Sequence, residues 1–179
     1  MIKRGWIMLC DIFNPARIKL DLEGTTKTDV FRELAGTIAG SDPEYKYEDI
    51  LEAVTLRETK MNTVVMPGIA VPHGYYSAIN GIVGAIGFSH TGIEYPNPDQ
   101  EPLTKQVIFS DVLLSDEAPD EVMLRYPVHL FFMLIMDESS REKHLHVLSR
   151  LLTMISSTAF TRIRDTGTPQ ELYNLLCNY

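Results

Sequence analysis

The chain has 179 residues, 45% of them hydrophobic, and a formal net charge of −8 at pH 7 with a pI near 5.1. This size suits one domain with a buried core and is short for two. The acidic balance argues against non-specific binding to nucleic acid or anionic lipid, because both require clustered lysine and arginine side chains. Protein partners or small ligands are expected instead.

The cysteines and the chain start indicate a compartment. Cys10 and Cys177 are the only cysteines and form no C-x-x-C pair, so neither a disulfide framework nor a cysteine-based zinc site is suggested. Asp11 interrupts the apolar start, and no small-residue cleavage site follows it. No run of about 18 apolar residues occurs. We therefore expect a cytoplasmic protein in a reducing environment.

Two amphipathic helices are predicted before residue 60. Residues 25–40 offer Thr26 as N-cap, followed by a helically spaced apolar stripe of Phe31, Leu34, Ala35 and Ile38. Residues 45–58 repeat this spacing at Tyr47, Ile50, Leu51 and Val54. The second helix is expected to close with a polar pair, Arg57 and Glu58.

Two buried strands and two more helices are predicted further on. Residues 81–89 and 128–136 are apolar and rich in β-branched and aromatic residues, which favours buried strands. Ser139 and Glu142 read as a capping box for a helix over 140–157, with a stripe of Leu145, Leu148, Leu152 and Ile155. A short final helix is expected from Thr168, Pro169 and Glu171, burying Leu172, Leu175 and Leu176. Helices interleaved with buried strands indicate an α/β domain.

The stretch between Gly92 and Pro127 is harder to interpret. It contains four prolines before Pro127 and an acidic patch over 116–121. Residues 107–114, VIFSDVLL, are a candidate strand.

His73 lies between Pro72 and Gly74 in the run GIAVPHG at 68–74. Pro72 biases Val71 towards extended geometry, and Gly74 lacks the Cβ that would obstruct a partner approaching the backbone beside His73. The imidazole is therefore expected to be displayed at a strand end. A neutral imidazole has one free lone pair, so His73 suits a general base, a metal ligand or a phosphoryl acceptor. The plain alternative is a turn histidine without a chemical role.

Metal, hydrolase and nucleotide sites are less well supported. His144 and His146 lie two apart on a predicted helix, where their side chains diverge, so they do not form a ligand pair. The chain has no G-x-S-x-G elbow and no G-x-x-x-x-G-K-[ST] loop. A protein phosphoryl donor fits better than ATP bound in such a loop.

Residues 56–74, LRETKMNTVVMPGIAVPHG, resemble the fructose and mannitol type of enzyme IIA domain of the bacterial sugar phosphotransferase system. That family carries an Arg-Glu pair, a Ser/Thr about five residues further on, and a G-I-A-[IV]-P-H-G signature. The likeness continues through TKTDVFRELA, GIVGAIGFSHTGI, residues 128–151 and TPQELYNLL, and covers most of residues 12–177. It implies one domain over 1–179 with a mixed β-sheet flanked by helices, enlarged at 93–126.

The resemblance also implies site residues. His73 matches the phosphorylated histidine, His144 a second active-site histidine, and Arg57 an arginine near the phosphoryl group. Thr63 matches the Ser/Thr, whose hydroxyl is a candidate donor to the imidazole or phosphate. Without the resemblance, each of these residues has a plainer interpretation. His144 could be a histidine at a helix start that bonds a backbone carbonyl, and Arg57 could be a solvated residue at a helix end. Thr63 could be an ordinary loop residue.

The implied partners are proteins. A phosphohistidine carrier would accept phosphoryl from the histidine phosphocarrier protein and pass it to an enzyme IIB component on a separate chain, without any cofactor or metal. The alternative is a regulatory member of nitrogen type, whose phosphorylation state controls binding to a transporter or kinase. A third reading is an interaction scaffold acting through 93–126. Tyr75 and Tyr76 are candidates for an apolar docking ring around His73.

Overall fold

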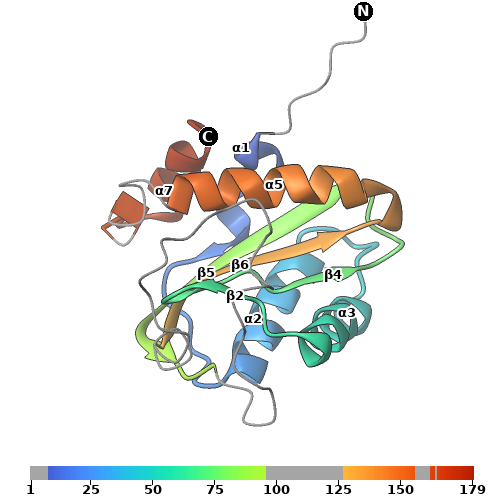
Figure 1. Cartoon of the computed structure of the whole chain (residues 1–179), viewed down its shortest axis with the longest axis horizontal. Helices are drawn as coiled ribbons and strands as arrows, with labels where there is room; N and C mark the ends of the chain where they lie inside the picture. Colours follow the sequence, from blue (N-terminus) through green and yellow to red (C-terminus); the bar gives the residue numbers. More distant parts are fainter. Residues whose placement is uncertain (1–7, 96–126, 156–161, 164) are drawn as a thin grey trace, which may run out of the picture.

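The computed structural model describes residues 8–95, 127–155, 162–163 and 165–179 (Figure 1). The candidate strand at 107–114 and the acidic patch lie outside these ranges. The elements in chain order are α1 (Leu9–Ile12), the 3-10 turn η1 (Pro15–Arg17), β1 (Ile18–Lys19), α2 (Lys27–Ala39), α3 (Tyr47–Lys60), β2 (Val64–Met66), β3 (Ile69–Ala70), β4 (His73–Tyr75), β5 (Ile82–Ile93), β6 (Val128–Met136), the 3-10 turn η2 (Glu138–Ser140), α5 (Arg141–Met154) and α7 (Pro169–Leu176).

The strands of the described residues form one sheet of six strands, and the prediction of a mixed sheet is confirmed. Its order is β1, β5, β6, β3 and β2, with β4 also paired to β6. β5 is antiparallel to β6 and parallel to β1, and β2 is antiparallel to β3. β3 and β4 both run parallel to β6, with Ile69 opposite Leu130 and His73 opposite Leu134. The two short strands therefore occupy successive stretches of one edge of β6.

Strand β6 is buried on both faces. Its even-numbered residues 130–136 pack with α1, α5 and α7, and its odd-numbered residues 131–135 pack with α2 and α3. Figure 1 shows α5 and α7 on one side of the sheet and α2 and α3 on the other. Because successive strand side chains point to opposite faces, a strand covered on both sides is apolar throughout. The prediction of a buried strand at 128–136 is confirmed.

Helix α2 matches its prediction closely. The Thr26 side chain accepts a hydrogen bond from the Asp29 amide at 3.2 Å, and the predicted stripe from Phe31 to Ile38 is buried. Helix α3 continues to Lys60, and Glu58 is buried where a polar helix end was expected. Glu58 lies four residues after Val54 and therefore shares the buried face of α3.

Helix α5 differs from its prediction in its cap and in its buried face. Ser140 is the N-cap, and the Ser139 hydroxyl donates to Asp137, so the predicted capping box is wrong. Leu145 is 60% exposed, while the face turned to the sheet carries His144, Val147, Leu148 and Leu151. Of the predicted stripe, Leu148 and Ile155 are buried, whereas the prediction for Leu145 is wrong. The start predicted for α7 is confirmed, and reciprocal bonds between Thr168 and Glu171 form a capping box there.

The two cysteines meet where α1 and α7 pack together. Both are free thiols. The neighbouring Cys177 thiol, chiefly by hydrogen bonding, and then burial raise the pKa of the Cys10 thiol. A raised pKa keeps a thiol protonated and weakly nucleophilic at neutral pH. In the described ranges, no helix has the length and apolar character needed to cross a membrane.

Candidate active site

His73 is the first residue of β4 and is half-buried. The predicted position at a strand end is confirmed. Gly74 has a different use from the one expected, since a Cβ there would lie 2.6 Å from the carbonyl carbon of Ala53 in α3. The missing side chain therefore lets α3 approach β4, and this approach brings Arg57 of α3 towards His73.

Hydrogen bonds fix the tautomer of His73. Its Nδ1 lies 2.9 Å from the Val71 carbonyl oxygen. A carbonyl only accepts, so Nδ1 carries the proton and Nε2 carries the lone pair. Arg57 Nε donates to Nε2 at 3.0 Å. The nitrogen able to act as a nucleophile is therefore the one that faces a permanent cation.

Arg57 is held in place at its other end by the backbone. Its Nη1 donates to the Met61 carbonyl oxygen at 2.8 Å, and the side chain is half-buried. The alternative of a solvated helix-end arginine is wrong. The planar guanidinium spans the loop after α3 and the imidazole, which a lysine ammonium would not do with the same geometry.

His144 lies against His73 from the opposite side of the sheet edge. The centroids of the two rings are 4.9 Å apart, with a 47° tilt between the ring planes. His144 is 7% exposed, and within the described part of the chain its Nε2 has no hydrogen-bond partner. A buried polar atom without a partner costs about 1–3 kcal/mol. Such an atom beside His73 is well placed to bind a ligand atom there.

Both imidazoles are neutral at physiological pH. Burial lowers the pKa of His73 to about 4, with Arg57 acting in the same direction and the Val71 hydrogen bond opposing them. Burial, then His73 and Arg57, lower the pKa of His144 to about 4. His73 Nε2 therefore carries no proton of its own at any pH near neutrality.

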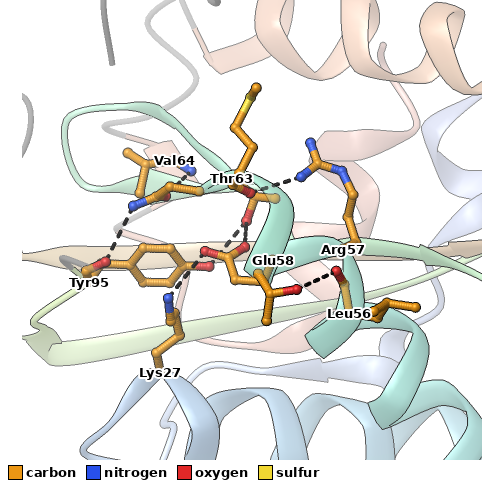
Figure 2. Close-up of polar contacts among 10 residues, drawn as sticks. Lys27, Leu56, Arg57, Glu58, Thr63, Val64 and Tyr95 are labelled. Atoms are coloured by element: carbon orange, nitrogen blue, oxygen red, sulfur yellow. Dashed lines mark hydrogen bonds and ion pairs between the residues drawn. The ribbon is translucent and has the colours of Figure 1, made fainter. Parts of the chain in front are cut away.

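Thr63 does not contact the imidazole. Its buried hydroxyl donates to Glu58 Oε2 at 2.6 Å and lies 3.1 Å from Tyr95 Oη (Figure 2). Lys27 Nζ completes the cluster, 3.4 Å from Glu58 Oε1. The predicted hydrogen bond from Thr63 to His73 is corrected, because the hydroxyl is already engaged in this cluster.

Sequence reasoning missed Glu58, Tyr95 and Lys27 as neighbours of the site. For Glu58 a signal existed, because its spacing from Ile50 and Val54 places it on the buried face of α3. Lys27 and Tyr95 come from distant segments and gave no local signal. Their contact depends on the packing of α2 and the end of β5 against α3.

The remaining histidines lie apart from the site. His129 is half-buried, and its Nδ1 lies 2.8 Å from the Ser89 carbonyl oxygen. His90 and His146 are exposed. Across the described ranges, no three His, Cys, Asp or Glu side chains gather as metal ligands.

The neutral histidine pair predicts a defined pH dependence of stability. Each pKa falls from 6.5 in the unfolded chain to about 4 in the fold. Between these values the unfolded state binds more protons, so the free energy of unfolding decreases as the pH falls, by up to about 1.4 kcal/mol per pH unit per histidine. Urea unfolding followed from about pH 7 to pH 5 measures this slope.

His144→Gln isolates one of the two contributions. We expect the free energy of unfolding of this variant to depend less steeply on pH, by the equivalent of about one bound proton, whatever the variant's stability at neutral pH. His146→Gln is the matched control on the same helix and should keep the wild-type slope. An unchanged slope in His144→Gln would contradict the assignment of a depressed pKa to His144.

The fold and the site together define a class: a three-layer α/β domain that presents a neutral histidine beside an arginine and a second, buried histidine. The sequence matches the model of the family described as "Phosphoenolpyruvate-dependent sugar phosphotransferase system, EIIA 2" over residues 11–118 and 117–179. The chain therefore belongs to this family, as the resemblance at 56–74 implied.

Individual relatives of two kinds are similar to the chain. A nitrogen regulatory protein of Pseudomonas aeruginosa is 26% identical over 171 residues, covering 95% of each chain. The crystal structure of nitrogen regulatory protein IIA-Ntr from Neisseria meningitidis superposes with a TM-score of 0.71 at 23% identity, covering 94% of this chain and 98% of that one. Enzyme IIA for mannitol of Escherichia coli, solved in complex with phosphorylated enzyme IIB, gives 0.64 at 15% identity, covering 93% and 98%.

Proposed function

We propose that the protein is a phosphohistidine carrier that accepts a phosphoryl group from the histidine phosphocarrier protein on His73 Nε2 and passes it to an enzyme IIB component on another chain. The observation that carries this proposal is the environment of Nε2. That atom has its lone pair free of protons, an arginine at 3.0 Å and a buried, unpartnered His144 nitrogen on the adjoining ring.

The transfer needs no chemistry beyond positioning and charge. The nitrogen–phosphorus bond of the donor breaks as Nε2 of His73 forms a bond to phosphorus, and the donor imidazole, which carries a proton on its other nitrogen, leaves as a neutral base. Nδ1 keeps its proton, and the Val71 carbonyl accepting from it at 2.9 Å stabilises the positive charge that the ring gains. In the next step a nucleophile of the IIB component forms a bond to phosphorus, the bond between Nε2 and phosphorus breaks, and His73 is again a neutral imidazole with its proton on Nδ1.

Two groups receive the phosphoryl oxygens. Arg57 releases the Nε2 lone pair when the bond to phosphorus forms, and its guanidinium then faces the new negative charge. His144, with its proton on Nε2, donates to a phosphoryl oxygen and so satisfies the buried nitrogen. His144 lies in the first turns of α5, where the helix dipole favours a nearby anion.

Exposed apolar side chains around the site suit docking of protein partners. The exposed large apolar side chains of the described residues all belong to segments that carry site residues, and they are Leu56, Met61, Tyr75 and Leu145. Tyr75, predicted for such a ring, is 38% exposed, whereas Tyr76 is half-buried and accepts a hydrogen bond from the Lys46 amide. An apolar ring excludes water from a labile phosphohistidine while a partner is bound.

A regulatory role is the second candidate, and the similarity to nitrogen regulatory proteins favours it. In this role the same phosphorylation of His73 would switch the binding of a transporter or kinase. A phosphoryl group adds about −1.5 to −2 charges, which is enough to oppose docking on an acidic surface. The two candidate functions share His73 as the phosphoryl acceptor and differ in the protein that the phosphorylated form binds next.

Phosphorylation of the purified protein tests the proposal. Incubation with phosphoenolpyruvate, enzyme I and the histidine phosphocarrier protein should add one acid-labile, phosphate-sized mass to the wild type. His73→Gln should gain none, while His146→Gln, with an exposed histidine changed, should be labelled like the wild type. A wild type that stays unlabelled with cognate donors, or a label that survives in His73→Gln, would contradict the assignment.

A second step separates the two candidates. Labelled protein is mixed with enzyme IIB proteins from the same organism, and the loss of label is followed by intact mass. Rapid transfer to a IIB protein supports the carrier role. Retention of the label together with phosphorylation-dependent binding to another protein supports the regulatory role.

A further inference from the structure

Beside the site lies a buried cluster of hydrogen-bonded polar side chains that the proposed transfer does not use. Glu58 and Thr63 are each 4% exposed and Tyr95 is 3% exposed, yet their polar atoms meet one another (Figure 2). Burial raises the pKa of Glu58, and the hydrogen bond from Thr63 and the charge of Lys27 oppose that shift. Burying a carboxylate is unfavourable unless it is paired, so this cluster is costly for a purely space-filling role.

The hydrogen bonds within this cluster have a definite direction. Thr63 has one hydroxyl proton, and it donates that proton to Glu58 Oε2 at 2.6 Å. Tyr95 Oη, 3.1 Å away, must then donate to Thr63 Oγ1. Lys27 Nζ contacts Glu58 Oε1 and lies 4.9 Å from the centroid of the Tyr95 ring. The Thr63 side chain is therefore held in one rotamer by partners on both sides.

The backbone of Thr63 connects this cluster to His73. The Thr63 carbonyl oxygen accepts from the Val71 amide at 2.9 Å. The Val71 carbonyl oxygen accepts from His73 Nδ1, also at 2.9 Å. The peptide groups of Thr63 and Val71 thus link a buried hydroxyl to the nitrogen whose proton sets the tautomer of the imidazole.

The same loop also carries a contact to Arg57. Arg57 and Glu58 are consecutive in α3, and each holds one side of the loop that follows the helix. Arg57 Nη1 bonds the Met61 carbonyl, and Glu58 bonds the Thr63 hydroxyl. Movement of Thr63 would therefore displace both the acceptor of His73 Nδ1 and the anchor of the guanidinium.

We propose that Thr63, held by Glu58 and Tyr95, is a positioning residue that fixes His73 in the tautomer with the proton on Nδ1 and thereby keeps Nε2 as the nucleophile. This inference rests on the proposed function for its effect on phosphoryl transfer. Its effect on the tautomer is a property of the unphosphorylated protein. In other histidine sites too, a hydrogen-bond acceptor that binds the N–H of one ring nitrogen leaves the other nitrogen unprotonated and so decides its chemistry.

A comparison of Thr63→Val with Thr63→Ser tests the inference. Valine keeps the shape and removes the hydroxyl, whereas serine keeps it. Thr59→Val, which removes an exposed hydroxyl bonded to the Leu56 carbonyl in α3, is the matched control. The 15N shifts of the His73 ring report the tautomer, and the rate of labelling by the phosphorylated donor protein reports transfer.

We expect Thr63→Val to increase the population with the proton on Nε2 and to slow labelling about ten- to a hundredfold, because misplacement of reacting groups is costly. Thr63→Ser and Thr59→Val should behave like the wild type. If Thr63→Val fails to fold, Tyr95→Phe, which keeps the buried ring, replaces it and should change the tautomer in the same direction. An unchanged His73 tautomer in the folded variant overturns the inference, whatever the rate.

Failure of the proposed function would look different. A wild type that accepts no phosphoryl group contradicts the carrier proposal, and the ring shifts of the unlabelled variants still decide the positioning role. A wild type that is labelled, with a Thr63→Val variant of wild-type tautomer, contradicts the positioning role alone.

Discussion

Arg57→Met is expected to slow phosphoryl transfer to His73 by about a hundred- to a thousandfold, the usual cost of removing one donor aimed at developing charge. In the resting site Arg57 Nε donates to His73 Nε2 at 3.0 Å. The guanidinium therefore already lies where phosphorus and its oxygens will arrive. Methionine removes the only cationic group bonded to the imidazole among the described residues.

An opposing effect is smaller. The hydrogen bond from Arg57 occupies the lone pair that must attack, so its loss frees the nucleophile. Removing Arg57 also raises the pKa of His73, because the cation is one cause of the lowered value of about 4. A hydrogen bond that involves a charged group, here the guanidinium, is worth about 1.5–3 kcal/mol, or roughly ten- to a hundredfold in rate. The loss of charge stabilisation in the transition state is larger, so the net effect of Arg57→Met is a slower transfer.

Arg57→Lys separates charge from geometry. Lysine retains a cation but lacks the planar fork that bonds His73 and the Met61 carbonyl together. We expect a rate between those of wild type and Arg57→Met. Arg32→Met, which removes an exposed arginine paired with Asp29 in α2, is the control and should transfer normally. Single-turnover labelling measures all four proteins, and wild-type transfer by Arg57→Met would refute the role of the guanidinium.

Local signals predicted much of the fold. Helices α2 and α7 have side-chain caps and regular apolar spacing in the sequence, so their bounds were predictable to within a residue or two. The run at 128–136 is apolar because both faces of β6 are covered, and it too was predictable. Strands β1 and β3 have two residues each, which is too few for any periodicity.

The buried face of α5 could not be predicted from spacing alone. Leu145, Leu148 and Leu152 form a plausible stripe, but of these the sheet covers Leu148, and His144 and Leu151 are buried where Leu145 was expected. A histidine counts as polar in any pattern, although here it is buried beside a second ring. The role proposed for His144 therefore conflicts with the apolar spacing that would locate the buried face of the helix.

The site was predictable only through its motif. Arg57, His73 and His144 lie on three different elements, and their proximity depends on β4 lying between α3 and α5 at the edge of β6. The resemblance supplied these residues, whereas physical reasoning from spacing supplied only His73. Thr63 was selected for the right motif and given the wrong partner, because the buried acid that holds its hydroxyl is invisible without tertiary packing.

The contact that assembles the site gives the second large prediction, Gly74→Ala. A Cβ at this position would lie 2.6 Å from the carbonyl carbon of Ala53 and 2.8 Å from the Val54 amide nitrogen. Both are backbone atoms in the middle of α3 and cannot rotate away. We expect the variant to lose about 1–3 kcal/mol of stability, as overpacked cores do, or to relieve the clash by moving α3 away from β4.

Relief by movement would carry a chemical cost. Arg57 lies one turn beyond Ala53 on α3, so a shift of the helix lengthens the contact between Arg57 Nε and His73 Nε2. A misplacement of about 1 Å can cost a hundredfold in rate. Gly74→Ala should therefore lower both the free energy of unfolding and the labelling rate, the latter measured under conditions where the variant is folded.

Gly36→Ala in α2 is the matched control for the added methyl group. The nearest atom to its Cβ is Tyr47 Cε2 at 3.9 Å, which is ordinary van der Waals contact. Alanine within a helix should raise stability by about 0.5–1 kcal/mol and leave labelling unchanged. Urea unfolding and single-turnover labelling of the two variants then distinguish a clash at one contact from a general effect of alanine. If Gly74→Ala behaves like Gly36→Ala, the close packing of β4 on α3 does not hold the two site residues together.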